Sequence, residues 1–444
     1  MEPEELTRYI QEQLLKKGTD SAIVSLQKQE SSQIKFSNSK VSAIKNWYQM
    51  AIGVYAVYKK RTIMISTRDF SKESADEVVD KLLKFAKNLP PNKEYNGIAK
   101  GPFKYRNVKK GFDKRVKELN KGENIEVVKQ AVDAAVKKGA KRVAGVLETD
   151  LSSVYLITSN NVIAREKSTS LYFSLRALVD KYASCHLNYG ARTMDGFEPE
   201  KIGRKAASLA KKAVNPVEGR SGKFDVLFSP LAFANILANL GEAFSVFSVE
   251  SGLSCLAGKL NKMIASPIVN IYDDGTVANA LGSSGFDAEG VPSKKTAVIE
   301  NGELKTYLHN SSTAKRHHTE TTANAGLVSP EPSNIVLEKG DSSEEDMLKE
   351  IKEGYYITNL WYTRFNNYNT GDFSTIPRDA VFYVKDGEIK FPVKHLRISD
   401  NILNILKNVK MIGNRPEQIF GWEIETPVIT PMVLVKGLNI TKSE

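Results

Sequence analysis

Short strand-forming segments separated by tight turn signals fill the second half of this 444-residue sequence. Asn301-Gly302 lies between the β-rich segments Thr296–Ile299 and Glu303–Leu308, and Asp386-Gly387 follows another such segment. Asn-Gly and Asp-Gly between strand-like segments indicate a hairpin, because both residues tolerate the positive φ of a tight hairpin turn. The pattern predicts a mostly antiparallel, β-rich C-terminal domain over residues 220–444.

The first half mixes two periodicities. Apolar residues recur at helical spacing in four segments, and alternating β-rich segments lie between them. The four predicted helices are Pro3–Lys17, Ser71–Asn88, Ile125–Lys138 and Pro199–Val214. A chain of this length is expected to form two or three domains. We predict an α+β fold with an N-terminal α/β subdomain (1–95), a basic connector (96–121), a second α/β subdomain (122–219) and the β-rich domain (220–444).

Positive charge is concentrated in the first half. The net charge is +11, made up of +16 for residues 1–220 and −5 for the remainder. The densest run, Lys100–Lys121, has nine basic and two acidic residues, with Phe103, Tyr105 and Phe112 among them. Basic residues interleaved with aromatic ones can bind single-stranded nucleic acid. A solvated linker explains the run better, because no known nucleic-acid-binding motif accompanies it.

The sequence offers few residues for self-contained chemistry. Two cysteines, Cys185 and Cys255, exclude a disulfide framework and a four-cysteine zinc site. Only five histidines are present, and His317 and His318 are adjacent, a spacing that does not let them bind one metal together. The sequence contains no phosphate loop, nucleophile elbow or dinucleotide-binding motif. Local motifs therefore predict no complete active site.

One apolar stretch, Val226–Val249, is long enough to consider as a membrane span. It contains Asn235, Asn239 and Glu242, which favour a buried helix of a soluble domain. The acidic N-terminal segment lacks the features of a signal peptide. We therefore expect a cytoplasmic protein with no membrane partner.

Polar residues in two places are candidates for function. Ser229-Pro230 is a typical helix start, and the helix predicted from it, Pro230–Phe247, carries Glu242 on its polar side. Asp287 and Glu289 are two residues apart and would share one face of a strand. No partner is visible for them, so a turn is favoured over an acid/base pair.

Six phrases in the second half resemble the TldD/PmbA family, whose members were once described as modulators of DNA gyrase and are now regarded as metalloproteases. They match in order and spacing from about residue 220 to the end. The phrases are Ser284–Pro292, Asn301–Leu308, Gly340–Met347, Thr370–Ser374, Asp386–Val393 and Ile398–Ile402. The first half matches more loosely, through Gly53–Val57 and Ser66–Ser71.

The resemblance implies which type of family member this is. The TldD type carries His-Glu-x-x-x-His on the helix that opens the second domain, and a late cysteine as a further zinc ligand. Zinc bound there would lower the pKa of its water to about 7. Here the matching helix has no histidine and the late segment Gln418–Glu425 has no cysteine. The chain resembles the TldE/PmbA type, so we expect no catalytic residue, metal ligand or cofactor in it, and zinc in a partner.

The implied function is that of a subunit which completes a cytoplasmic peptidase with a TldD-like, metal-bearing chain and acts on unfolded or small peptides. Glu242 remains as a lone carboxylate without an assigned role. Gly371, Asp372 and Phe373 belong to a family motif, and a structural role for them is favoured over peptide contact. Two alternatives stay open: a stand-alone binding protein, for instance for nucleic acid, and an independent peptidase with a metal site of another kind.

Overall fold

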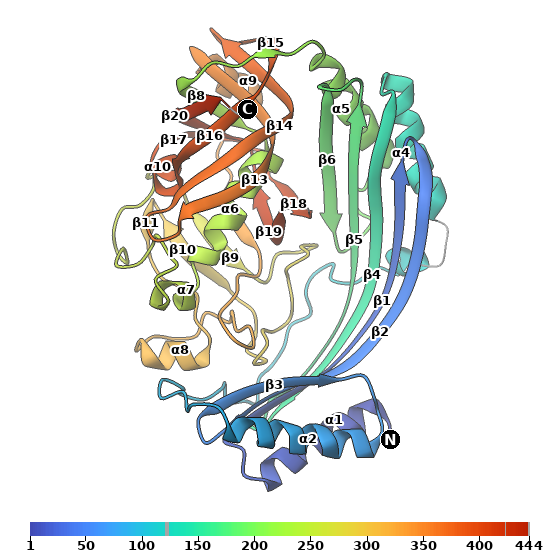
Figure 1. Ribbon diagram of the computed structural model, residues 1–444, viewed down its shortest axis with the longest axis vertical. Coiled ribbons are helices and arrows are strands. Elements are labelled where there is room, and N and C mark those ends of the chain that lie inside the picture. The colour runs from blue at the N-terminus through green and yellow to red at the C-terminus, as the bar shows by residue number, and fades with distance from the viewer. Residues whose placement is uncertain (120–123, 422, 443–444) are drawn as a thin grey trace.

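The computed structural model describes residues 1–119, 124–421 and 423–442. The last two residues of the predicted connector and residue 422 of the late segment lie outside the described residues. An N-terminal region built on one long sheet curves beside a β-rich C-terminal region (Figure 1). The predicted α+β fold is confirmed.

The N-terminal sheet has six antiparallel strands in the order β3-β2-β1-β4-β5-β6. Its strands are β1 Ser21–Ser37, β2 Lys40–Tyr58, β3 Arg61–Thr67, β4 Arg142–Thr158, β5 Ile163–Leu178 and β6 Ser184–Ala191. The helices of this region are α1 Pro3–Lys16, α2 Lys72–Lys87, α3 Lys114–Leu119, α4 Asn124–Lys138 and α5 Pro199–Lys212. Because β1 pairs with both β2 and β4, residues 1–95 and 122–219 contribute to one sheet and do not form two.

Strand alternation decides which face each helix covers. Along β1, Ala22 and Val24 pack with α1 and α2, and Ile34 and Phe36 pack in the cluster that includes α4 and α5. These residues are an even number apart, so both helix pairs cover the same face of the sheet, at its two ends (Figure 1). Ile23 points to the opposite face, in a cluster with Phe286 of the C-terminal region.

The C-terminal region contains a closed barrel and a second sheet. β13 Glu353–Asn367, β8 Gly222–Phe228, β20 Val433–Lys442, β16 Leu396–Asn401 and β14 Asp372–Lys385 pair in that order, and β14 pairs back to β13. β15 Glu388–Lys394, β7 Val217–Glu218 and β17 Val409–Ile412 extend this sheet. The second sheet has the order β11 Glu303–Leu304, β10 Lys295–Glu300, β9 Ile271–Asp274, β12 Ile335–Leu337, β19 Ile424–Thr430 and β18 Glu417–Gly421.

The helices of the C-terminal region are short. They are α6 Pro230–Ala243, α7 Val246–Glu250, α8 Ser311–Arg316, α9 Glu344–Lys349 and α10 Ile402–Lys407. The prediction of one helix over Pro230–Phe247 is wrong in its end, because the chain turns at Phe244 and restarts as α7. No helix among the described residues is long and apolar enough to cross a membrane.

Candidate functional site

Helix α6 forms one wall of a cavity of about 550 Å³. Asn239 and Glu242 reach it from α6, and the opposite walls come from β13 and from the segment around β19. The lining residues from those walls are Thr363, Arg364, Phe365, Tyr368, Glu423, Glu425 and Thr426. The cavity is lined by α6 and by part of the late segment, the two places from which the family resemblance implies zinc ligands in TldD-type chains.

The local sequence holds α6 firmly in place. The Ser229 hydroxyl accepts a hydrogen bond from the Ala232 N–H at 3.2 Å and donates one to the Thr358 carbonyl of β13 at 2.6 Å. Most side chains of α6 are buried, including Asn235, whose amide oxygen accepts a hydrogen bond from the Thr363 hydroxyl. The polar side of the helix is therefore fixed against β13, and only Asn239 and Glu242 remain half-exposed or exposed.

Two carboxylates dominate the electrostatics of this cavity. Burial raises the pKa of Glu242 above its ordinary value, and the negative charge of Glu425 raises it further. Arg364 is the one cationic side chain among the lining residues, and its guanidinium lies 3.9 Å from a carboxylate oxygen of Glu423. Glu242 and Glu425 thus repel each other.

These residues do not fit a zinc ion. Structural and catalytic zinc sites use imidazole, thiolate or carboxylate ligands, three or four at a time. The cavity offers no imidazole and no thiolate, and residues 1–119, 124–421 and 423–442 contain no group of three His, Cys, Asp or Glu side chains placed to hold a metal.

Asp287 and Glu289 lie together in one loop, and neither of them lines the α6 cavity. Asp287 accepts hydrogen bonds from the N–H groups of Glu289, Val291 and Ala325 at 2.9–3.0 Å, so it organises its own loop. Glu289 is buried and accepts one from the Ala99 N–H at 3.1 Å. Burial raises the pKa of Asp287 to about 6 and, with the charge of Asp287, that of Glu289 to about 7. This loop joins the connector to the C-terminal region.

The motif Gly371-Asp372-Phe373 lies behind the α6 cavity. Phe373 is buried, and its ring centroid is 6.2 Å from that of Phe365, which lines the cavity. Asp372 accepts hydrogen bonds from Thr370 Oγ1 at 2.6 Å and Asn401 Nδ2 at 2.9 Å, which hold its pKa below the usual range. Gly371 has a φ of +83°. All three residues therefore contact the protein's own turn and core.

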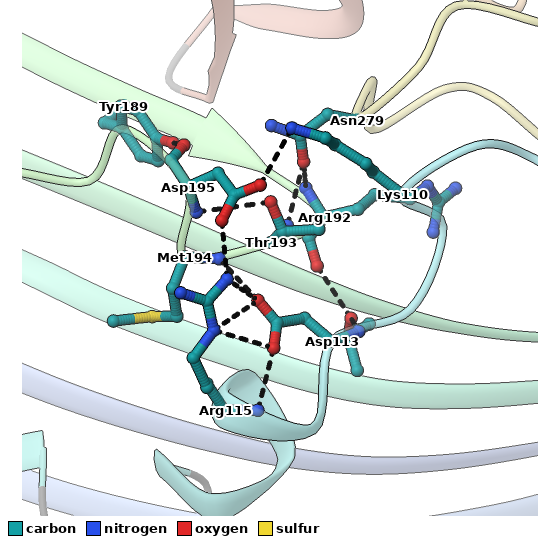
Figure 2. A network of polar contacts seen from close by, with 10 residues as sticks. Lys110, Asp113, Arg115, Tyr189, Arg192, Thr193, Met194, Asp195 and Asn279 are labelled. Carbon is teal, nitrogen blue, oxygen red and sulfur yellow. Dashed lines mark hydrogen bonds and ion pairs between the residues drawn. The ribbon is translucent and has the colours of Figure 1, made fainter.

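Carboxylates partly neutralise the basic connector, as Figure 2 shows. Lys110 forms an ion pair with Asp195 at 2.8 Å, and Arg115 forms ion pairs with both Asp113 and Asp195 at 2.7 and 2.6 Å. Beside them, Arg192 donates to the carbonyls of Ala280, Leu281 and Ser283. This network binds the connector to the loop after β6 and positions the C-terminal region.

Sequence reasoning did not find Arg364 or the pairing of Glu242 with Glu425. The two carboxylates are 183 positions apart and meet only because α6 packs against β19. A weak signal exists in the late segment, where carboxylates stand in the region that the resemblance assigns to a cysteine. Nothing in the local sequence distinguishes Arg364 from other surface arginines.

Comparison with known proteins agrees with the resemblance. The PmbA/TldA metallopeptidase models for domain 1, the central domain and the C-terminal domain match residues 22–86, 114–214 and 221–442. A metalloprotease of Methanocaldococcus jannaschii is 28% identical over 434 residues, which cover 93% of each chain. The crystal structure of a candidate modulator of a DNA gyrase from Thermotoga maritima matches with a TM-score of 0.88 and 25% identity, over 99% of this chain and 100% of that one. TldE from Thermococcus kodakarensis matches with a TM-score of 0.86 and 22% identity, over 99% of both chains. Since the three matched segments span most of the sequence, the chain belongs to the PmbA/TldD metallopeptidase family.

Proposed function

We propose that this chain is the TldE/PmbA-type subunit of a cytoplasmic, two-chain metallopeptidase. A TldD-like partner would carry the zinc and its histidines, and this chain would complete the enzyme and help to hold unfolded or small peptides. The isolated chain would then have no peptidase activity of its own.

The donor set of the α6 cavity carries this proposal. Where the resemblance implies histidines in a TldD-type chain, α6 presents Asn239 and Glu242, and the described residues of the opposite walls add the carboxylates Glu423 and Glu425 but no imidazole or thiolate. Catalytic zinc sites in proteins are built mainly on histidine or cysteine ligands, and the described lining of this cavity has neither. The fold shared with TldE of Thermococcus kodakarensis is consistent with the same assignment.

Co-expression with a TldD-like chain from the same genome tests the proposal. We expect a stable heteromer on size exclusion, peptidase activity in the heteromer alone, and loss of that activity when a chelator removes the metal. Elemental analysis of the isolated chain, prepared without chelators, should give far less than one zinc per chain. A tight one-to-one zinc, or peptide hydrolysis by the isolated chain, would overturn the proposal.

The nucleic-acid alternative receives less support. Lys110 and Arg115 form ion pairs with Asp113 and Asp195, so nearby carboxylates reduce the positive charge that this part of the connector presents to phosphates. Nucleic-acid binding through phosphates weakens steeply as salt rises. Salt-sensitive retention of the isolated chain on single-stranded DNA, together with failure to form a heteromer, would favour the alternative.

A further inference from the structure

A second cavity, of about 470 Å³, lies between the N-terminal sheet and the barrel, where β6 faces β14 (Figure 1). We call it the β6–β14 pocket. Its walls carry four cationic side chains, two aromatic rings that the cations approach, and a single carboxylate, Asp379. The cations and rings are Arg176, Lys181, Arg378, Lys394, Tyr182 and Trp361. Glu218, next to these lining residues, lies 3.6 Å from the Lys394 ammonium and 3.0 Å from the His395 ring, so the positive charge available to a ligand comes mainly from the two arginines and Lys181.

The Asp379 carboxylate is already paired with other groups of the protein. The Asp379 side chain is 3% exposed and lies 3.1 Å from the Arg176 Nε in an ion pair. It also accepts hydrogen bonds from Ser184 Oγ at 2.7 Å and Asn359 Nδ2 at 2.8 Å. Asp379 has a φ of +63°, a conformation that costs about 1–3 kcal/mol and persists where the surrounding contacts impose it. The pocket floor is therefore rigid, and Asp379 serves to fix Arg176.

The other cationic side chains of the pocket keep N–H groups with which they can bind a ligand. The guanidinium carbons of Arg176 and Arg378 lie 4.4 and 5.5 Å from the centre of the Trp361 ring. Stacking uses the face of a guanidinium and leaves its N–H edges free for an oxyanion. Within the described residues, neither Arg378 nor Lys181 forms an ion pair, whereas Lys394 lies 4.2 Å from the centre of the Tyr182 ring and pairs with Glu218 at 3.6 Å.

We propose that the β6–β14 pocket binds a carboxylate of a peptide, either an acidic side chain or a free C-terminus. A fork of arginine N–H groups pairs well with a planar carboxylate, and the rings provide contact area for the flanking residues. Trp361 and Arg364 both belong to β13, so this strand borders both the β6–β14 pocket and the α6 cavity.

This substrate preference rests on the proposed peptidase function, but its binding step does not require the partner chain. A single-stranded nucleic acid is the rival ligand for basic and aromatic residues. The pocket favours the peptide, because Arg176 and Arg378 both lie beside the Trp361 ring, where their planar N–H groups suit a planar carboxylate.

Fluorescence anisotropy with the full-length chain tests the proposal. Four labelled octapeptides would differ only in Glu or Gln side chains and in a free or amidated C-terminus. We expect at least tenfold weaker binding for the peptide that has Gln side chains and an amidated C-terminus. Whether Glu side chains or a free C-terminus restores binding then shows which carboxylate the pocket binds. R378Q is expected to weaken binding of the carboxylate peptides about tenfold. K385Q, which changes an exposed lysine at the end of β14 outside the pocket, should change it less than twofold.

Equal binding of all four peptides, or an unchanged affinity in R378Q, would overturn the proposal. So would an oligothymidylate that competes for the pocket more tightly than the Glu peptides, since phosphate would then be the ligand. Unfolding midpoints of R378Q and K385Q control for folding, and W361A provides a second variant of the pocket. Heteromer formation is scored separately on size exclusion, so failure of the proposed function and failure of this pocket give different results.

Discussion

Carboxylates in this protein differ sharply in what surrounds them. Asp372 is exposed and accepts two side-chain hydrogen bonds, which stabilise its charged form. Partial burial of Glu242 and nearly complete burial of Glu289, each with a second negative charge nearby, raise the pKa of both carboxyls. A carboxyl with a raised pKa indicates a functional site only when other groups around it support that function. Here Glu242 and Glu289 line different cavities, so they do not act on one ligand together.

Glu289→Gln measures the cost of burying the Glu289 charge. The folded-state pKa of about 7 lies above the ordinary value of 4.5, so the folded protein holds this proton more tightly than the unfolded chain. The penalty is absent below pH 4.5, grows as the pH rises to about 7, and is complete above it. We expect E289Q to unfold with a free energy about 1–3 kcal/mol higher than wild type at pH 8, and about equal at pH 4.5, by urea denaturation.

Glu320→Gln is the matched control, since Glu320 is exposed. Its effect should be small and the same at both pH values. If E289Q gained no stability at pH 8, the Ala99 N–H and Ser311 would have to compensate the buried charge fully.

Glu242→Ala tests whether this chain supplies a catalytic group. Without metal ligands around it, Glu242 has no metal-bound water to activate, so we expect heteromer activity to stay within about tenfold of wild type. The corresponding change in each of the partner's histidines should abolish activity. A loss of about 10³ or more with assembly intact would equal about 4 kcal/mol of transition-state stabilisation and would make Glu242 a catalytic residue.

Helices and strands with a clear period were predictable from the sequence. α1, α2, α4 and α5 end within one or two residues of the predicted bounds, because their apolar stripes and their flanking residues agree. The apolar residues after Ser229 predict a helix that is too long, because Phe244 and Phe247 continue the helical spacing beyond the end of α6. Tertiary contacts end α6: the Ser254 hydroxyl donates to the Ala243 carbonyl at 2.7 Å, and the Ser245 hydroxyl donates to the Pro330 carbonyl.

Local sequence also fails to predict the C-terminal strands correctly. The apolar, β-rich sequence Val428–Val435 predicts one strand, but this prediction is wrong, because Pro431 and Met432 separate β19 from β20, and these strands belong to different sheets. The sites depend even more on pairing between distant segments. Arg176, Trp361 and Asp379 come from β5, β13 and β14, and no local pattern indicates that they meet.

Gly371→Ala tests the structural role of the family motif. Two costs are expected: the positive φ of +83°, and a new Cβ that would lie 3.0 Å from Ile402 Cγ2 and 3.1 Å from Cys255 Cβ. Gly18 has a φ of +82° with nothing within 4 Å of a Cβ, so Gly18→Ala carries the backbone cost alone. By urea denaturation, we expect about 1 kcal/mol for G18A and about 2–4 kcal/mol for G371A. Equal losses would show that the turn relaxes to admit the methyl group.

At the scale of the whole molecule, a few polar residues fix the C-terminal region against the N-terminal sheet. Arg192, at the end of β6, donates to three carbonyls of the segment after β9. Glu166 of β5 accepts hydrogen bonds from Ser284 Oγ at 2.6 Å and the Gly285 N–H at 3.0 Å. The family phrase that begins at Ser284 therefore acts here as an anchor between the two regions.

Arg192→Ala is expected to loosen this junction. The substitution leaves the carbonyls of Ala280, Leu281 and Ser283 without their donor, at a cost of about 2–4 kcal/mol. Urea denaturation and limited proteolysis of the connector would report the loss. Arg204→Ala, which removes an exposed ion pair with Glu200 on α5, should cost at most about 0.5 kcal/mol. Similar small losses in both variants would show that the apolar contacts alone hold the two regions together.

The order of strands in the N-terminal sheet also determines when its strands can pair during translation. β1 can pair with β2 as soon as both have emerged, but its other edge belongs to β4, whose first residue follows the end of β1 by 105 positions. At about 5–20 residues per second, that edge stays open for roughly 5–20 seconds of translation. During this interval the nascent chain presents a 17-residue strand with unpaired N–H and C=O groups, the surface on which chains pair wrongly with one another. Chaperone demand during synthesis should therefore peak before residue 142 is made, and slower translation over 100–140 should lower the yield of native protein.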